Sequence, residues 1–357
     1  MAEQRITYSE YLHLHQMLAL QDGGTASGRE ITHDEMHFII VHQSFELWFK
    51  LVINELTAAK SLMSKEQVPE SDIPIVVHHF RRTIEILKLM QSQWRVMETL
   101  SPQGFLAFRD DLGTASGFES FQMRHLEIIL GLDKQKRPGG MDPLAHFKKL
   151  ASESEDGEKA WQRLLKVSSE DTLVDVLTRW LARTPINGSI PNDEGDEAVV
   201  STFIGSHLES MAKHDADSLA KHISLGTPNI EKVEEGFSNS QQAAMDFLIP
   251  EGNISRHRAG LLFIESYREL PLLAWPRALI DCIVELEQQL LLFRHHHARM
   301  VERMIGRRVG TGGSSGVDYL DMTTKPRIFT DLWEVRTLLV KRSGISDVEN
   351  PEFYGFA

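Results

Sequence analysis

Residues 275–306 of the chain read WPRALIDCIVELEQQLLLFRHHHARMVERMIG. Pro276 stands near the start, where the missing N–H of a proline costs a helix nothing, and Gly306 follows the last apolar position. The pattern predicts one helix of roughly 45 Å, at about 1.5 Å per residue. Most helices of globular proteins are shorter, so this segment favours an all-α protein built from long helices.

One histidine interrupts the apolar stripe of this predicted helix. His297 lies four residues after Phe293 and three before Met300. Successive helical residues are turned by about 100°, so at most one residue of the run 295–297 can face the stripe. A buried histidine needs a hydrogen-bond partner or a metal. Because the stripe holds no second Cys, His or carboxylate, a zinc site is disfavoured, whereas a core histidine and a haem ligand both stay open.

Helical periodicity also dominates the rest of the chain, and strand signals are few. We predict long helices at about 34–63 and 74–100, and a helix that begins at Ser101-Pro102. Residues 116–119 resemble a capping box that opens a further helix ending at Gly131. We expect one domain over residues 1–357. Its weakest helical part, at about 133–195, we interpret as an insertion with short helices at 143–154 and 170–183.

Composition restricts the possible partners and locations. The 357 residues are 41% hydrophobic, and 38 Lys and Arg against 51 Asp and Glu leave a net charge of −13. An acidic chain is a poor partner for nucleic acid or anionic lipid, so we expect neither. The single cysteine, Cys282, fits a reducing compartment and excludes a CxxCH haem attachment motif. With no signal-peptide pattern and no long apolar run, we expect a cytoplasmic protein without membrane spans.

Two further positions are candidates for binding. His42 lies with Phe38 and other aromatic residues on one helical face, where a core histidine is the simpler interpretation. Arg109 follows Phe105 by four residues, so both project from one face of a short helix. A guanidinium beside an aromatic ring suits a carboxylate substrate, although a surface salt bridge to a neighbouring aspartate fits the spacing equally well.

The glycine-rich stretch 306–316, GRRVGTGGSSG, separates two predicted helices. It lacks the GxxxxGK[ST] pattern and the preceding strand of a phosphate-binding loop. A flexible linker is one interpretation. A lid whose N–H groups and hydroxyls close over a small ligand, with Thr311 among them, is the other.

Four motifs in this order resemble the tryptophan 2,3-dioxygenase family: YSEYLHL, HDEMHFIIVHQSFELWFKLVINEL, FLAFRDDLGTASGFESFQMRHLE and HHHARMVERMIGRRVGTGGSSGVDYL. The resemblance covers most of the chain. It implies an intertwined all-α homotetramer whose helical bundle encloses haem b, held non-covalently. It also implies that L-tryptophan and O₂ are the substrates and N-formylkynurenine the product, within the kynurenine pathway of tryptophan catabolism.

The resemblance also implies individual roles. His297 would be the axial ligand of the haem iron, with Gly310 and Gly312 beside the cofactor. His42 would accept a hydrogen bond from the indole N–H. The remaining substrate contacts would come from Phe38, Phe105, Arg109, Leu112, Ser116 and Thr311, and from Tyr8 and Tyr11 of a neighbouring subunit.

Two other functions stay open at this stage. One is a haem-dependent monooxygenase that adds a single oxygen atom at C3 of tryptophan or a methylated tryptophan. A related tyrosine-hydroxylating group attaches its haem through a cysteine four residues after the histidine ligand. Val301 occupies that position here, which disfavours that group. The other alternative is a non-catalytic sensor of haem or tryptophan.

Overall fold

The structure is a computed structural model that describes residues 6–23, 30–113, 115–133, 135–137, 142, 144–310 and 316–355. Within these ranges the regular secondary structure is helical, and the one extended pairing is an isolated bridge between Ile186 and Ser189. The all-α prediction is therefore confirmed.

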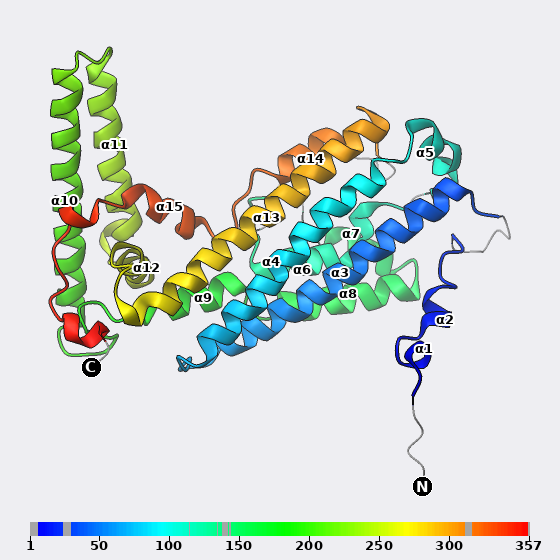
Figure 1. Ribbon diagram of the computed structural model, residues 1–357, viewed down its shortest axis with the longest axis horizontal. Helices are drawn as coiled ribbons and strands as arrows, with labels where there is room; N and C mark the ends of the chain where they lie inside the picture. Colours follow the sequence, from blue (N-terminus) through cyan, green and yellow to red (C-terminus); the bar gives the residue numbers. More distant parts are fainter. Residues whose placement is uncertain are drawn as a thin grey trace, which may run out of the picture.

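Three long helices form the central body: α3 (His33–Met63), α4 (Asp72–Met97) and α13 (Ala274–Ile305). They run side by side, and α4 packs against both of the others (Figure 1). The helix predicted at 275–306 is thus confirmed, with Gly306 as its C-cap. Despite their length, none of the described helices has an apolar stretch that could cross a membrane.

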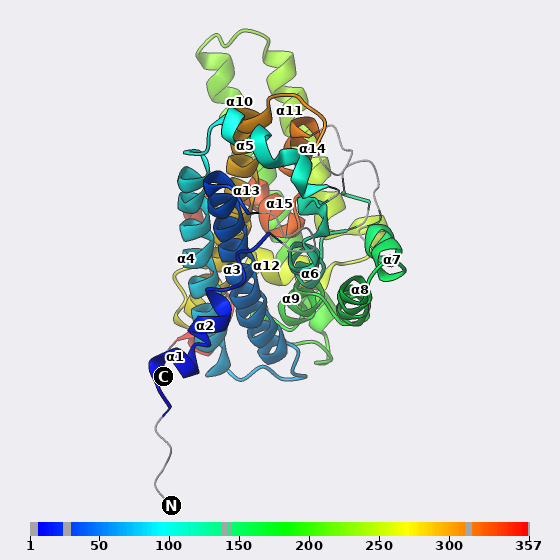
Figure 2. The same cartoon turned by 90° about the vertical axis from the view of Figure 1, so that its right-hand side faces the viewer.

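Shorter helices cover this body and carry the loops around it. In the view turned by 90°, α6 and α9 lie beside α3, with α7 and α8 on the outside (Figure 2). Helix α14 packs on α13, and α12 packs on α9 and α15. The bounds of these helices are α5 (Pro102–Phe108), α6 (Phe121–Leu130), α7 (Ala145–Ala151), α8 (Glu155–Ser168), α9 (Leu173–Ala182), α12 (Arg256–Ser266), α14 (Val317–Thr323) and α15 (Thr330–Leu338).

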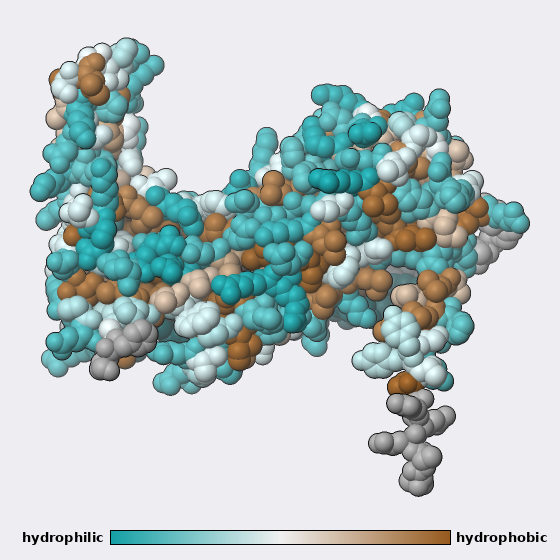
Figure 3. Space-filling view, viewed as in Figure 1, coloured by the Kyte–Doolittle hydropathy of each residue, from teal (hydrophilic) through white to brown (hydrophobic). Residues whose placement is uncertain are grey.

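Two parts of the chain project from the body. Helices α10 (Asp196–Ser224) and α11 (Ile230–Leu248) form an antiparallel hairpin whose surface is mostly hydrophilic (Figure 3). At the other end of the molecule, α1 (Tyr8–Tyr11) and α2 (Leu14–Met17) form an arm that hangs away from the long helices (Figure 1). Sequence analysis placed no helix in the hairpin region.

Helix starts follow local side-chain chemistry, with one correction. The Ser101 hydroxyl accepts a hydrogen bond from the Gly104 N–H at 2.9 Å, which confirms the predicted start of α5. The capping box at 116–119 is wrong as the start of α6. Ser116 caps only a short 3₁₀ turn, and Ser120 caps α6 by accepting from the Met123 N–H. Both serines stand before a turn whose backbone N–H groups a hydroxyl can cap, so the spacing in the sequence did not show which of them begins α6.

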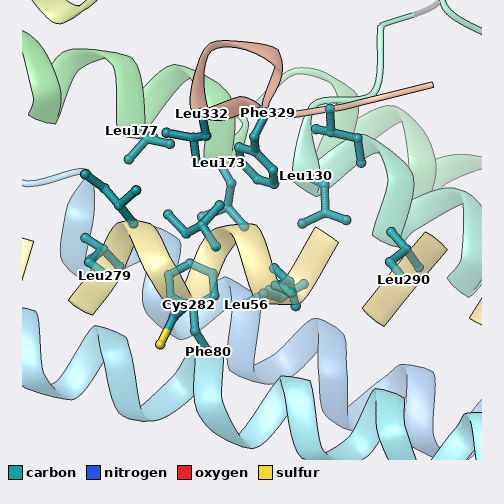
Figure 4. Close-up of a cluster of buried hydrophobic side chains, with 14 of the residues drawn as sticks. Leu56, Phe80, Leu130, Leu173, Leu177, Leu279, Cys282, Leu290, Phe329 and Leu332 are labelled. Carbon is teal, nitrogen blue, oxygen red and sulfur yellow. The ribbon is translucent and has the colours of Figure 1, made fainter. Parts of the chain in front are cut away.

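The core lies where α13 meets the surrounding helices. Leu56 of α3, Phe80 of α4 and Leu130 of α6 meet side chains of α9, α13 and the segment that leads into α15 (Figure 4). Leu56 and Phe80 are fully buried. Burying apolar area contributes about 25 cal/mol per Å², so this cluster is a major source of stability.

Residues 133–195, predicted as an insertion, contain α7, α8 and α9. Helices α8 and α9 pack against α6, and α9 also packs against α3 and α12. The segment is therefore integral to the described body. Its status as an insertion relative to other proteins stays a prediction.

Glu287 of α13 fixes the segment that leads into α15. Its buried carboxylate accepts hydrogen bonds from the backbone N–H groups of Ile328 and Phe329 and from the indole N–H of Trp333. A charged acceptor with several donors is costly to remove, because the donors stay buried without partners.

We expect Glu287→Ala to lower the free energy of unfolding by about 3 kcal/mol or more. Glu285→Ala, on the same helix but at a half-exposed position, should cost less than about 1 kcal/mol. Urea unfolding of both variants measures the difference. Equal losses would show that the Glu287 contacts contribute no special stability.

Candidate functional site

A large pocket opens between α3, α6, α13 and α14. It holds about 1230 Å³ of empty space, counted out to its mouth. Its lining is mostly apolar and comprises Phe38, His42, Met97, Phe105, Arg109, Ser116, Gly117, Phe118, Met123, Arg124, Glu127, Phe293, Arg294, His297, Met300, Val301, Met304, Ile305, Gly310, Gly316, Tyr319, Leu320 and Thr323.

His297 is the histidine that faces this pocket. His295 and His296 are exposed on the outer side of α13, as the helical rotation predicts. His297 lies deep in the body, and the part of its ring that is not covered by protein borders the cavity. Burial lowers the pKa of His297 to about 4, with a further lowering from the nearby His42. Its imidazole is therefore neutral at pH 7, the form that can donate a lone pair to a metal.

Trp94 of α4 supports the His297 ring. The two rings are stacked at 4.9 Å between centroids and are nearly parallel, with 4° between their planes. Trp94 also contacts Phe45 at 4.3 Å and Phe293 at 5.4 Å. The indole N–H of Trp94 is buried, and among the described residues it has no hydrogen-bond partner. This packing fixes the plane of His297.

His42 of α3 also lines the pocket. Its Nδ1 lies 2.8 Å from the carbonyl oxygen of Phe38, and a carbonyl oxygen can only accept, so Nδ1 carries the proton. Its Nε2 is then an unprotonated acceptor. Burial lowers the pKa of His42, although the Phe38 carbonyl and Glu46 act in the opposite direction. The ring packs on Phe38 at 4.0 Å between centroids.

Arg109 brings a positive charge to the same pocket. It is the first residue of a 3₁₀ turn, Arg109–Leu112, that continues α5. Its Nη2 donates to the carbonyl oxygen of Val309 at 2.6 Å. The side chain thus links the wall formed by α5 to the first part of the glycine-rich stretch. Phe105, buried one turn earlier, lies beside it in the lining.

Two glycines of the glycine-rich stretch border the pocket. Gly310 and Gly316 both contribute to the lining. Gly316 has φ +60°, and a Cβ there would lie 2.7 Å from the carbonyl oxygen of Arg308. Only glycine allows this backbone conformation and this close approach.

Several predicted site residues are not part of the pocket. Leu112 packs against the hydrophobic core but does not line the cavity. Tyr8 and Tyr11 are 75% and 70% exposed, on the arm that hangs away from the body. Thr311 and Gly312 lie outside the described residues. Phe38, His42, Phe105, Arg109, Ser116, His297 and Gly310 do come together.

The structure adds residues that sequence analysis missed. Arg294, Tyr319 and Glu127 line the pocket, and Trp94 stacks on His297. Arg294 precedes His297 by three residues, so helical spacing places a charged residue on the pocket face of α13. Trp94 belongs to the apolar periodicity of α4, but nothing in the spacing shows that it faces His297. Tyr319 and Glu127 gave no signal at all.

Histidines elsewhere have ordinary structural roles. His79 pairs with Glu55 at 2.7 Å, and His207 is hydrogen-bonded to the carbonyl oxygen of Leu338 at 2.9 Å. Over the described ranges, no three His, Cys, Asp or Glu side chains gather closely enough to hold a metal ion by themselves.

The lowered pKa of His297 has a measurable consequence. A free histidine titrates near pH 6.5 and His297 at about 4, so between these values the unfolded chain binds more protons than the folded one. The free energy of unfolding of the ligand-free protein should fall as the pH drops from about 6.5 to 4. For this group the slope reaches at most about 1.4 kcal/mol per pH unit.

We expect the free energy of unfolding of His297→Phe to depend less on pH, because the contribution of His297 is gone. Urea unfolding at pH 7 and pH 5 measures this dependence. His296→Phe, at the exposed neighbouring position, should leave the slope as it is in the original protein. An unaltered slope in His297→Phe would contradict the buried neutral state of this histidine.

The sequence of the chain is similar to those of several known proteins. A sequence profile of the tryptophan 2,3-dioxygenase family matches residues 1–339. The tryptophan 2,3-dioxygenase of Sorangium cellulosum is 40% identical, over 98% of this chain and 87% of its own length. Tryptophan 2,3-dioxygenase 2 of Ralstonia nicotianae is 40% identical, over 99% and 98%. A tryptophan 2,3-dioxygenase-like protein of Xanthomonas campestris is 38% identical, over 72% of this chain and 98% of its own. The chain therefore belongs to the tryptophan 2,3-dioxygenase family.

Proposed function

We propose that this chain is a haem-dependent enzyme that cleaves the C2–C3 bond of the indole ring of L-tryptophan with O₂. The product is N-formylkynurenine, in the kynurenine pathway of tryptophan catabolism. The observation that carries the proposal is that one pocket brings together His297, His42 and Arg109. Membership of the family supports it independently.

The pocket residues fit haem b. His297 presents a neutral ring that borders the cavity. One histidine is enough as a protein ligand for haem iron. The pocket walls around His297 are mostly apolar, which suits the porphyrin ring of haem b. The only cysteine, Cys282, does not line the pocket, so the haem is held without a thioether bond.

Two features of the chain prepare His297 for this role. Stacking on Trp94 holds the imidazole plane in one orientation. Burial keeps the ring unprotonated over the whole physiological range, so no proton competes for its lone pair. When bound, ferrous haem supplies the redox chemistry that allows O₂ to react with an indole ring.

Arg109 and the aromatic residues would hold the substrate. The guanidinium of Arg109, which lines the pocket, can pair with both oxygens of the tryptophan carboxylate. Phe38 and Phe105, whose ring centroids lie 5.8 Å apart, provide an apolar wall for the indole. Ser116 adds a hydroxyl to this wall. The contact we predict for Leu112 requires a movement of its turn.

His42 would orient the indole. With Nδ1–H bonded to the Phe38 carbonyl, Nε2 can accept a hydrogen bond from the indole N–H. Because its pKa is lowered by burial, His42 is a weak base that positions the ring and does not remove its proton. The apolar walls exclude water from the reacting atoms.

The reaction balances without an external electron donor. The C2–C3 bond breaks, one oxygen atom of O₂ becomes the formyl oxygen on the former C2, and the other becomes the ketone oxygen on the former C3. A monooxygenase on the same scaffold would place one atom in the product and would need two electrons to reduce the other.

We propose a homotetramer in the cytoplasm, as expected for this family. Tyr8 and Tyr11 are exposed on a projecting arm, which is compatible with an arm that reaches the pocket of a neighbouring subunit. Thr311, Gly312 and the described Gly310 would then close over the substrate and cofactor from the glycine-rich loop.

Mass spectrometry of the product tests the proposal. Haem-loaded, reduced protein is given L-tryptophan and ¹⁸O₂, and we expect a product that carries two labelled oxygen atoms and has the absorbance of a formylkynurenine. D-alanine, which lacks the indole ring, is a matched control that should consume no O₂.

One labelled atom would instead identify a monooxygenase. A spectral change on tryptophan binding without any product would point to another indole substrate or to a sensor. Either result would overturn the proposed dioxygenase.

A further inference from the structure

A second hollow lies between α10 and the segment that follows α15. It holds about 1050 Å³ of empty space, counted out to its mouth, and it shares no lining residue with the main pocket. We call it the lysine groove. Its lining is mostly polar and comprises Ser210, Lys213, His214, Asp217, Ser218, Lys221, Val340, Lys341, Ser343 and Gly344.

One wall of the lysine groove is a single face of α10. The lining residues of this helix follow one another at steps of 3, 1, 3, 1 and 3, from Ser210 to Lys221. Residues at such steps lie on the same side of a helix. At about 1.5 Å per residue, the two lysines of this face, Lys213 and Lys221, lie roughly 12 Å apart along the helix axis.

The opposite wall is fixed by contacts on either side of it. His207 Nε2 donates to the Leu338 carbonyl at 2.9 Å, and the hydroxyls of Ser206 and Ser346 lie 3.0 Å apart. Both contacts involve the same turn of α10. Between Leu338 and Ser346 the chain forms the 3₁₀ turn Arg342–Gly344. The segment crosses the hairpin in Figure 1, and the hollow lies where this turn faces the next three turns of α10.

The lysine groove carries positive charge that the protein does not balance. Lys213, Lys221 and Lys341 line it against one carboxylate, Asp217, so the surplus is 3 − 1 = 2 positive charges with His214 neutral. Within the described part of the chain, none of these three lysines forms an ion pair. A hollow lined by one sign of charge concentrates ions of the opposite sign.

This surplus is unusual for the chain. With 51 Asp and Glu against 38 Lys and Arg, acidic partners are in excess. Arg342, next to Lys341 in the sequence, pairs with Glu269 at 2.5 Å and with Asp347 at 3.1 Å. Unpaired ammonium groups from two separate segments therefore meet in one hollow although the composition favours pairing.

We propose that the lysine groove binds a small molecule that carries a phosphate group. A phosphate monoester has about two negative charges at neutral pH, which matches the surplus. A lysine ammonium is a point charge on a flexible stem, so lysines from both walls can converge on the phosphate oxygens. The hydroxyls of Ser218 and Ser343, which have no hydrogen-bond partner among the described residues, can donate to the same group.

The charge outside the groove limits the size of the ligand. Glu209 precedes the first lining residue of α10 and is exposed, and the side chain of Asp347, beyond the opposite wall, is 95% exposed. The whole chain has a net charge of −13. A nucleic acid or an anionic membrane would extend past the lysines and meet this negative surface, whereas a small phosphate ester would not.

Phosphorus NMR tests the proposal. The ³¹P signal of glucose 6-phosphate is followed as full-length protein is added at fixed ionic strength. We expect the signal to broaden and shift, and we expect Lys213→Gln, Lys221→Gln and Lys341→Gln each to raise the Kd about three- to tenfold. Inorganic phosphate should compete for the site because it presents the same group, and glucose should not compete.

Two further variants separate a phosphate site from a general charge effect. Asp217→Asn should lower the Kd about two- to fivefold, because it removes the one negative charge of the groove. Lys232→Gln is the matched control, since Lys232 is exposed on α11 of the same hairpin and does not line the groove. It should leave the Kd unchanged. All five variants alter exposed side chains, and urea unfolding verifies that they stay folded.

Three results would overturn the proposal. The first is an unchanged ³¹P signal at millimolar protein and ligand. The second is a rise in the Kd of Lys232→Gln equal to that of the groove variants, which would place the binding on the general surface. The third is retention on heparin that the groove variants abolish and glucose 6-phosphate does not reduce, which would identify an extended polyanion as the ligand.

Discussion

The aromatic contact among Phe45, Trp94 and Phe293 determines how the three long helices meet. Each ring comes from a different helix, α3, α4 and α13, and the centroids lie 4.3 to 5.8 Å apart. This contact sets the separation of α3 and α13 one turn before His297. Beyond this contact the same helices form the walls of the pocket. Phe38 and His42 of α3 line one side, and His297 of α13 lines the other. A smaller ring at any of these positions would let the walls approach.

The pocket combines low polarity with a few charged side chains. Burial keeps His297 and His42 neutral, whereas the arginines stay charged because a guanidinium remains protonated at any physiological pH. Neutral histidines suit binding and orientation, and fixed cations suit carboxylates. In the pocket, neutral histidines would therefore lie where bonds change, and charged arginines would lie where carboxylates are held. Arg109, Arg124 and Arg294 bring these charges to the pocket lining.

Periodicity was sufficient to predict the all-α class, the three long helices and the inward face of His297. Those properties follow from local spacing, because one face of a helix repeats every three or four residues. The hairpin of α10 and α11 was not predicted, although α11 places its buried residues Ala244, Phe247 and Leu248 at helical spacing. The stacking of His297 on Trp94 depends on which helices become neighbours, and spacing along one helix does not contain that information.

The axial role of His297 is the central claim, and resonance Raman spectroscopy of the ferrous haem-loaded protein tests it most directly. The iron–histidine stretching band should be present in the original protein and absent in His297→Gly, and it should return when imidazole is added to that variant. His296→Gly, at the exposed neighbouring position, should keep the band. A band that persists in His297→Gly without imidazole, or that disappears in a variant of His42 instead, would contradict the account.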